Sequence, residues 1–63
     1  MKHTIQMLEN NEVMHSILEG DISLADFPAV MQERVSNPYF KSIKVLIADY
    51  TNVTNIDYQA AEI

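Results

Sequence analysis

The chain has 63 residues, of which nine are acidic and four basic, so that its formal net charge is -5, and it contains no cysteine. This length allows one domain at most, and a chain of this size buries only roughly 60% of the surface that it exposes when unfolded. Without cysteine, neither disulfides nor a cysteine-ligated zinc ion can add stability. The remaining sources of stability are self-association and membership of a larger domain.

The charge of the chain also excludes several classes of partner. Its Lys and Arg residues are scattered and form no run or stripe that could neutralise phosphates, which disfavours nucleic acids and anionic membrane surfaces. Residues 1–6 contain no apolar segment of signal-peptide length, and no stretch approaches the ~20 apolar residues that a membrane span requires. We therefore expect a soluble, cytoplasmic protein.

The first element that the sequence predicts is a β-hairpin. Residues 3–8 and 13–18 alternate loosely between apolar and polar side chains, and Asn10 and Asn11 between them tolerate the positive φ of a tight turn. Pairing across this turn sets Met7 opposite Met14, Ile5 opposite Ser16 and His3 opposite Leu18. The face predicted to enter the core carries Ile5, Met7, Met14 and Leu18. The other, mixed face carries Thr4, Gln6, Leu8, Val13, His15 and Ile17.

A helix is predicted after Gly20, the only glycine of the chain. Ser23 and Asp26 are both suited to capping, and Pro28 is accepted only in the first turn of a helix. We therefore expect an opening turn from Ser23 and a main helix from Asp26 to about Val35. Its apolar stripe, expected to pack on the sheet, consists of Leu24, Phe27, Val30, Met31 and Val35. The residues expected to point to water are Gln32, Glu33 and Arg34.

The strongest strand signal is the aliphatic run at residues 43–48, which is typical of a strand buried on both faces of a parallel sheet. The pair Asn37-Pro38 ends the preceding helix. A strand, a helix and a second strand form a βαβ unit with a right-handed crossover and parallel strands. The predicted fold class is therefore α/β: a β-hairpin followed by a βαβ unit, with residues 43–48 in the middle of a mixed sheet.

Polar residues follow this strand, and we interpret residues 50–56 as a loop. A second helix is expected from Asp57, or from Asn55 as its cap, to Ile63. About six residues do not form a stable helix by themselves. The sequence therefore predicts a single partial domain over residues 1–63 that is cut within its second helix.

Residues 45–57 resemble the central strand and switch loop of STAS-like domains, the fold of anti-sigma factor antagonists and of SpoIIAA-like proteins. In that family an apolar strand ends in aspartate, a short loop with a valine follows, and a second aspartate opens a helix; Asp49, Val53 and Asp57 match these positions. Residues 18–27 are similar to the turn from strand to first helix in these domains. The resemblance covers most of the chain and implies a STAS-like mixed sheet in a domain longer than 63 residues.

The sequence of this chain differs from that of the STAS-like family at the phosphorylation site. In phosphorylated antagonists the second aspartate is followed by two serines, the second being the phosphate acceptor. In this chain Tyr58 and Gln59 stand at these positions, and Gln59 has no hydroxyl group. A phosphorylation switch is therefore not expected.

The candidate site lies beyond the end of the predicted central strand, because ligands of open α/β sheets bind outside the carboxyl ends of the strands. Tyr50 and Tyr58 are the expected aromatic anchors for a protein partner. The other candidate partner-binding residues are Asp49, Thr51, Asn52, Thr54 and Asp57. In the alternative interpretation Asp57 is only a helix cap and the Thr and Asn residues are only turn formers.

No catalytic or metal-binding constellation is evident. His3 and His15 are predicted on opposite faces of the hairpin, so they cannot share a metal ion within one chain. No Gly-rich phosphate loop and no serine nucleophile motif is present, and no cofactor is expected. We thus predict a non-enzymatic regulatory or protein-interaction module, which self-associates if 63 residues are the full chain. The alternative is a carrier of a small apolar, lipid-like ligand with a cavity under the helix at residues 26–35.

Overall fold

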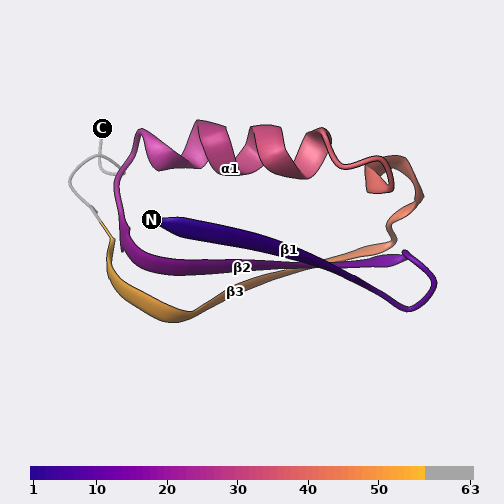
Figure 1. The fold of residues 1–63 in the computed structure, drawn as a ribbon, viewed down its shortest axis with the longest axis horizontal. Coiled ribbons are helices and arrows are strands. Elements are labelled where there is room, and N and C mark those ends of the chain that lie inside the picture. Colours follow the sequence, from indigo (N-terminus) through magenta and orange to yellow (C-terminus); the bar gives the residue numbers. More distant parts are fainter. Residues whose placement is uncertain (57–63) are drawn as a thin grey trace.

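The computed structural model describes residues 1–56, which form a three-stranded sheet with one helix over one of its faces (Figure 1). The elements in chain order are β1 (Lys2–Leu8), β2 (Val13–Ile22), α1 (Asp26–Val35), the short 3-10 helix η1 (Phe40–Ser42) and β3 (Val45–Ile56). The strand order is β1-β2-β3, with β1 antiparallel and β3 parallel to β2. The predicted fold class, a β-hairpin followed by a βαβ unit, is confirmed. The predicted second helix lies outside the described residues.

The hairpin has the predicted register. Met7 pairs with Met14, Ile5 with Ser16 and His3 with Leu18. Asn10 and Asn11 have φ values of 58° and 66°, and the turn is closed by a 3.1 Å hydrogen bond from the Glu12 N–H to the Glu9 carbonyl. Asparagine adopts this left-handed conformation more readily than most residues, because its short polar side chain bonds locally. The turn therefore fixes which hairpin side chains enter the core.

Strand β2 is longer than predicted because a glycine lets it continue past an irregularity. Its pairing with β3 shifts register between Ile17 and Glu19 and again between Gly20 and Asp21. Gly20 has a φ of +84°, which L-residues with a Cβ adopt only at a cost. The second half of β2 thereby reaches Ile22, which is buried in the core.

The core of the described residues is small and lies between β2 and α1. Its fully buried apolar side chains are Met14, Leu18, Ile22 and Val30. Phe27, Val53 and Ile56 pack against it from the helix and from the end of β3. Helix α1 begins at Asp26 as predicted, and the Ser23 N–H donates a 2.8 Å hydrogen bond to its carboxylate, which lowers the pKa of Asp26. Neither this helix nor any other among residues 1–56 has the length and apolar character of a membrane span.

The predicted orientation of α1 is correct for Phe27 and Val30, which lie toward the core, and for the exposed Gln32 and Glu33, but it is wrong for the other residues. Arg34, expected in water, is only 8% exposed, whereas Leu24, Met31 and Val35, expected on the sheet, are half exposed. Phe27, Val30 and Arg34 form the side of the helix that faces the sheet. Polar partners beneath the helix explain this rotation, because they give the guanidinium group of Arg34 hydrogen bonds in the interior.

The predicted position of the aliphatic strand is also wrong. The strand β3 lies at the edge of the sheet, and its residues Val45, Leu46 and Ile47 are 50%, 42% and 44% exposed. Residues 50–56, predicted as a loop, continue this strand to Ile56. The centre of the sheet is β2, which pairs with both neighbours, so that the single helix covers β2 and leaves β3 largely open.

Candidate functional site

The predicted partner-binding residues that the structure describes all lie on β3. Asp49, Tyr50, Thr51, Asn52 and Thr54 belong to this one strand, but its pairing with β2 shifts register beyond Asp49, so their side chains do not alternate regularly between the two faces of the sheet. Asp57 and Tyr58 lie outside the described residues. The site is thus a stretch of edge strand rather than a loop after a central strand.

Asp49 is held on the face of the sheet that α1 does not cover. Its carboxylate accepts a 2.9 Å hydrogen bond from the Thr51 N–H and lies 3.0 Å from Nε2 of His15 on β2. Hydrogen bonds from the Thr51 hydroxyl and N–H, and then from His15, lower the pKa of Asp49 to about 2. Asp49 is therefore ionised near neutral pH, and its side chain is fixed rather than free to turn outward.

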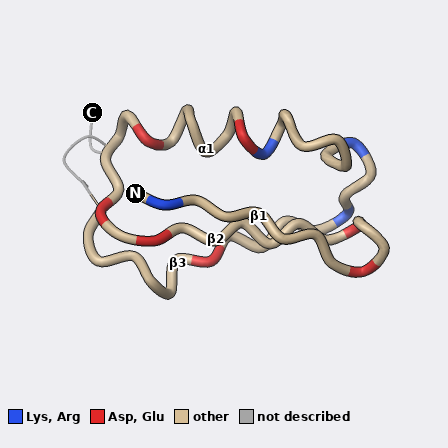
Figure 2. Tube along the Cα trace, viewed as in Figure 1, with Lys and Arg blue, Asp and Glu red and all other residues tan. Residues whose placement is uncertain are grey.

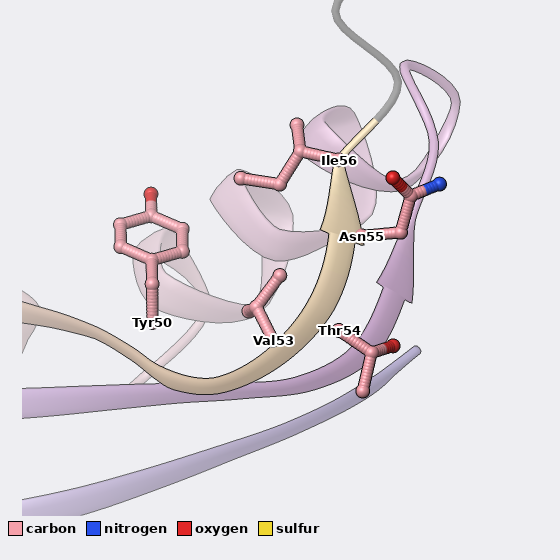
Figure 3. Close-up of a pocket in the computed structure, with 5 residues that line it drawn as sticks. All are labelled: Tyr50, Val53, Thr54, Asn55 and Ile56. Atoms are coloured by element: carbon pink, nitrogen blue, oxygen red, sulfur yellow. The ribbon is translucent and has the colours of Figure 1, made fainter.

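On the opposite face, the end of β3 borders a cavity of about 370 Å³ that is open to solvent. Figure 3 shows the side chains of Tyr50, Val53 and Ile56 projecting from the same side of β3. Thr54 and Asn55 complete the lining, and the Thr54 hydroxyl donates a 2.7 Å hydrogen bond to Asp21 on β2. The cavity was predicted under α1, but Leu18, Ile22 and Val30 fill the interface between the helix and β2. The open cavity lies instead beside the end of β3.

A buried polar network, which the sequence did not predict as a site, connects β1, β2 and α1. Oγ of Ser16, fully buried, lies 2.5 Å from Nε2 of His3 and accepts a 3.0 Å hydrogen bond from Nε of Arg34. Nδ1 of His3 lies 2.9 Å from a carboxylate oxygen of Glu33. If Nδ1 of His3 carries the proton, it donates a hydrogen bond to Glu33, and Nε2 accepts a hydrogen bond from the Ser16 hydroxyl. Every contact then pairs a donor with an acceptor.

The order Glu33, His3, Ser16 is that of an acid, a base and a hydroxyl nucleophile, but its location differs from that of a catalytic site. The side chain of His3 is 1% exposed and Ser16 is fully buried beneath α1, so a substrate has no route to the hydroxyl. The Ser16 oxygen also already accepts a hydrogen bond from Arg34. The network therefore ties the helix to the hairpin.

Part of this network could have been found from the sequence. The hairpin register already placed His3 and Ser16 on the core face, where a polar pair needs further partners. The helix stripe assigned by hydrophobicity pointed instead to Leu24, Met31 and Val35, and so turned Arg34 away from that pair. Among residues 1–56 no group of three or more His, Cys, Asp or Glu side chains is placed to hold a metal ion.

Comparisons of the chain with family models, with curated proteins and with solved structures found no match. The resemblance to STAS-like domains therefore rests on the residues that carry it.

Proposed function

We propose that this chain is a non-enzymatic protein-interaction module of regulatory type, STAS-like and cytoplasmic, which binds a partner along β3. The observation that carries the proposal is the position of β3. Nine of its 12 residues pair with β2 on one side, and among the described residues no strand pairs with the other side. An open strand edge presents unpaired N–H and C=O groups, to which an extended segment of a partner can add as a further strand.

The composition of β3 supports this proposal. Proteins protect exposed edges with lysine, proline or short strands, but β3 contains neither residue and is the longest strand described. The basic residues lie elsewhere, at the start of β1, on α1 and in the connection between α1 and β3 (Figure 2). Asp49 is the only charged residue within β3, and its engagement with His15 and Thr51 leaves the edge without a free charge to repel a partner strand.

The apolar side chains of β3 supply contacts on both faces of such an added strand. Leu46 and Tyr50 lie on the face toward α1, and Val45 and Ile47 on the other face; each is between 42% and 50% exposed. Main-chain pairing contributes affinity and these side chains contribute specificity, as in other proteins that bind by strand addition. Tyr50 is the described aromatic anchor of the interface.

Photo-crosslinking tests this proposal with a matched pair of positions. Tyr50 on β3 and Tyr39 before η1 are 43% and 45% exposed, so a benzoyl-phenylalanine at either position is equally accessible to a partner. We expect a cross-linked product from position 50 and none from position 39 in cells that produce the full chain. Mass spectrometry of the product distinguishes a second copy of the chain from another protein.

The substitution I47K provides the second arm of this experiment. A lysine at Ile47 adds an edge charge at an exposed position and should remove the product at position 50. Equal cross-linking from positions 39 and 50, or a product that I47K leaves unchanged, would contradict binding along β3.

The cavity beside Tyr50 favours a second candidate function, the carriage of a small apolar ligand. Its volume of about 370 Å³ falls within the range of ligand sites, about 300–1,000 Å³, and Tyr50, Val53 and Ile56 provide an apolar wall. Native mass spectrometry of the purified chain should then show a bound apolar molecule, and V53K should release it. A spectrum of the bare chain alone would contradict this function and leave strand addition unaffected.

A further inference from the structure

Arg34 combines deep burial with an incomplete set of partners. It is 8% exposed, and its Nε and Nη1 contact Ser16 Oγ at 3.0 Å and Met31 Sδ at 3.6 Å. Nη2 is buried and has no hydrogen-bond partner within residues 1–56. The carboxylate of the adjacent Glu33 is directed to His3 instead. A buried guanidinium without an acceptor for one nitrogen is costly, and a carboxylate is the acceptor that suits it best.

The contacts of α1 indicate on which flank the free nitrogen lies. Glu33 reaches His3 on β1, so this flank of the helix faces β1. Met31 lies roughly 160° around the helix from Glu33, because successive residues are separated by about 100°. Met31 is thus on the flank toward β3, and the contact of Nη1 with its sulfur places the end of Arg34 on the same flank.

This flank and β3 together form an exposed apolar surface, which we call the α1–β3 surface. Its residues, each between 42% and 52% exposed, are Leu24 in the turn before α1, Met31 and Val35 of α1, and Leu46 and Tyr50 of β3. Ser16, the partner of Arg34, pairs with Ala48 of β3. The small side chain of Ala48 lies between those of Leu46 and Tyr50 on this face, so the surface has its least bulky position at the level of Arg34.

We propose that the α1–β3 surface binds an amphipathic helix of a partner, whose apolar face carries one carboxylate that accepts a hydrogen bond from Nη2 of Arg34. Helix α1 has 10 residues, or about 15 Å along its axis, so the complementary helix has about three turns. Its carboxylate lies over Ala48, and its apolar side chains on either side contact Leu46 and Tyr50. This inference rests on Arg34 and does not depend on strand addition at the β3 edge.

A helix fits this surface better than a small molecule does. A helix is about 10 Å wide and strands are about 4.8 Å apart, so that α1 covers about two strands and leaves the width of β3 free beside it. Small-molecule sites enclose most of their ligand, whereas the half-exposed residues of this surface form a broad and open area. Charge complementarity then determines the kind of helix, because the buried guanidinium of Arg34 disfavours an apolar or basic side chain at that level.

A display library of helices tests the inference on the full 63-residue chain. The library carries helices of about three turns, the length inferred for the complementary helix, with an apolar stripe and with all amino acids allowed at the stripe positions. We expect the helices that bind to carry Asp or Glu at a single central stripe position, and replacement of that acid by its amide to weaken binding about tenfold. Selection against R34M should remove the preference for an acid, and selection against the exposed-site control K44M should retain it.

A second pair of variants covers the case in which R34M does not fold. Met31 and Gln32 are both exposed positions of α1, and M31K and Q32K add the same charge to the same helix. The selected helix should bind M31K about tenfold more weakly and Q32K as well as the parent chain. Four results would each overturn the inference: binders without an acidic residue, an acid preference that persists against R34M, equal binding to M31K and Q32K, or no helical binder at all. The proposal of strand addition at the edge of β3 is tested separately, by cross-linking.

Discussion

Strands β2 and β3 run parallel in the same sheet and present similar side chains toward α1, yet the helix covers only one of them. On β2 the residues that face the helix, Met14, Ser16 and Leu18, are fully buried. On β3 the residues of the same face, Leu46 and Tyr50, are 42% and 43% exposed. Burial in this molecule therefore follows from position in the sheet and not from the hydrophobicity of the strand, because the more aliphatic run at residues 45–47 is the more exposed one.

The division of labour between the two strands follows from this difference. The central strand β2 carries the apolar core and the polar network that connects α1 to the hairpin. The edge strand β3 carries exposed side chains, and among the described residues its outer side pairs with no strand. Stability should thus depend mainly on β2 and binding mainly on β3.

The largest effect is expected when a leucine is replaced by alanine on each of the two strands. L18A should lower the free energy of unfolding by about 2–5 kcal/mol, because it removes a fully buried side chain and leaves a cavity. L46A, on the same face of the sheet but half exposed, should cost about 1 kcal/mol or less. Urea unfolding followed by circular dichroism measures both values. Equal losses would mean that β3 is as well packed as β2.

The polar network should show the same contrast with a smaller effect. S16A leaves Nε of Arg34 and a ring nitrogen of His3 buried without a partner, at a cost of about 1–3 kcal/mol. The reciprocal change A48S places a hydroxyl on the paired, exposed position of β3 and should alter stability by less than about 0.5 kcal/mol. The same urea experiment compares them, and a neutral S16A would show that the network does not stabilise the attachment of α1.

The junction of the two strands depends on the backbone of Gly20. G20A forces an L-residue to a φ of +84° and should cost about 1–2 kcal/mol. Apart from Gly20 and its two chain neighbours, the only heavy atom of residues 1–56 within 4 Å of the added Cβ is Cα of Met1, at 3.9 Å, so a steric clash contributes little.

D-alanine at position 20 is the matched control, because it adopts positive φ without this strain, and a chain of this length is accessible by chemical synthesis. The thermal unfolding of the D-alanine chain should resemble that of the parent. If both alanine chains unfold at the same lower temperature, the cost comes from the side chain and not from the backbone.

Local signals in the sequence predicted the helix and the strands well. They did not predict which side chains are buried, because burial depends on how these elements pack together. Asn10, Asn11 and Pro28 act through their own backbone angles, so the hairpin register and the start of α1 followed from short-range rules. The burial of β3 depends on how many strands and helices surround it, which no local pattern encodes. The orientation of Arg34 depends on His3 and Ser16, which are distant in sequence, so the polar network and the α1–β3 surface required the three-dimensional structure.

The smallest expected effect concerns Asp49, the one charged residue of β3. Because hydrogen bonds hold its pKa at about 2 in the folded chain, below the ordinary value, the stabilisation that they provide is present above about pH 4 and is lost as the pH falls toward about 2. The acid dependence of the urea midpoint should therefore be weaker in D49N. T51V removes the hydroxyl that contributes most to the shift and keeps the N–H, so the pKa of Asp49, measured by NMR titration of its carboxyl carbon, should rise in T51V without reaching the ordinary value. An unchanged pKa in T51V would show that the Thr51 hydroxyl does not hold the carboxylate in place, and that the Thr51 N–H and His15 are sufficient to keep the pKa of Asp49 low.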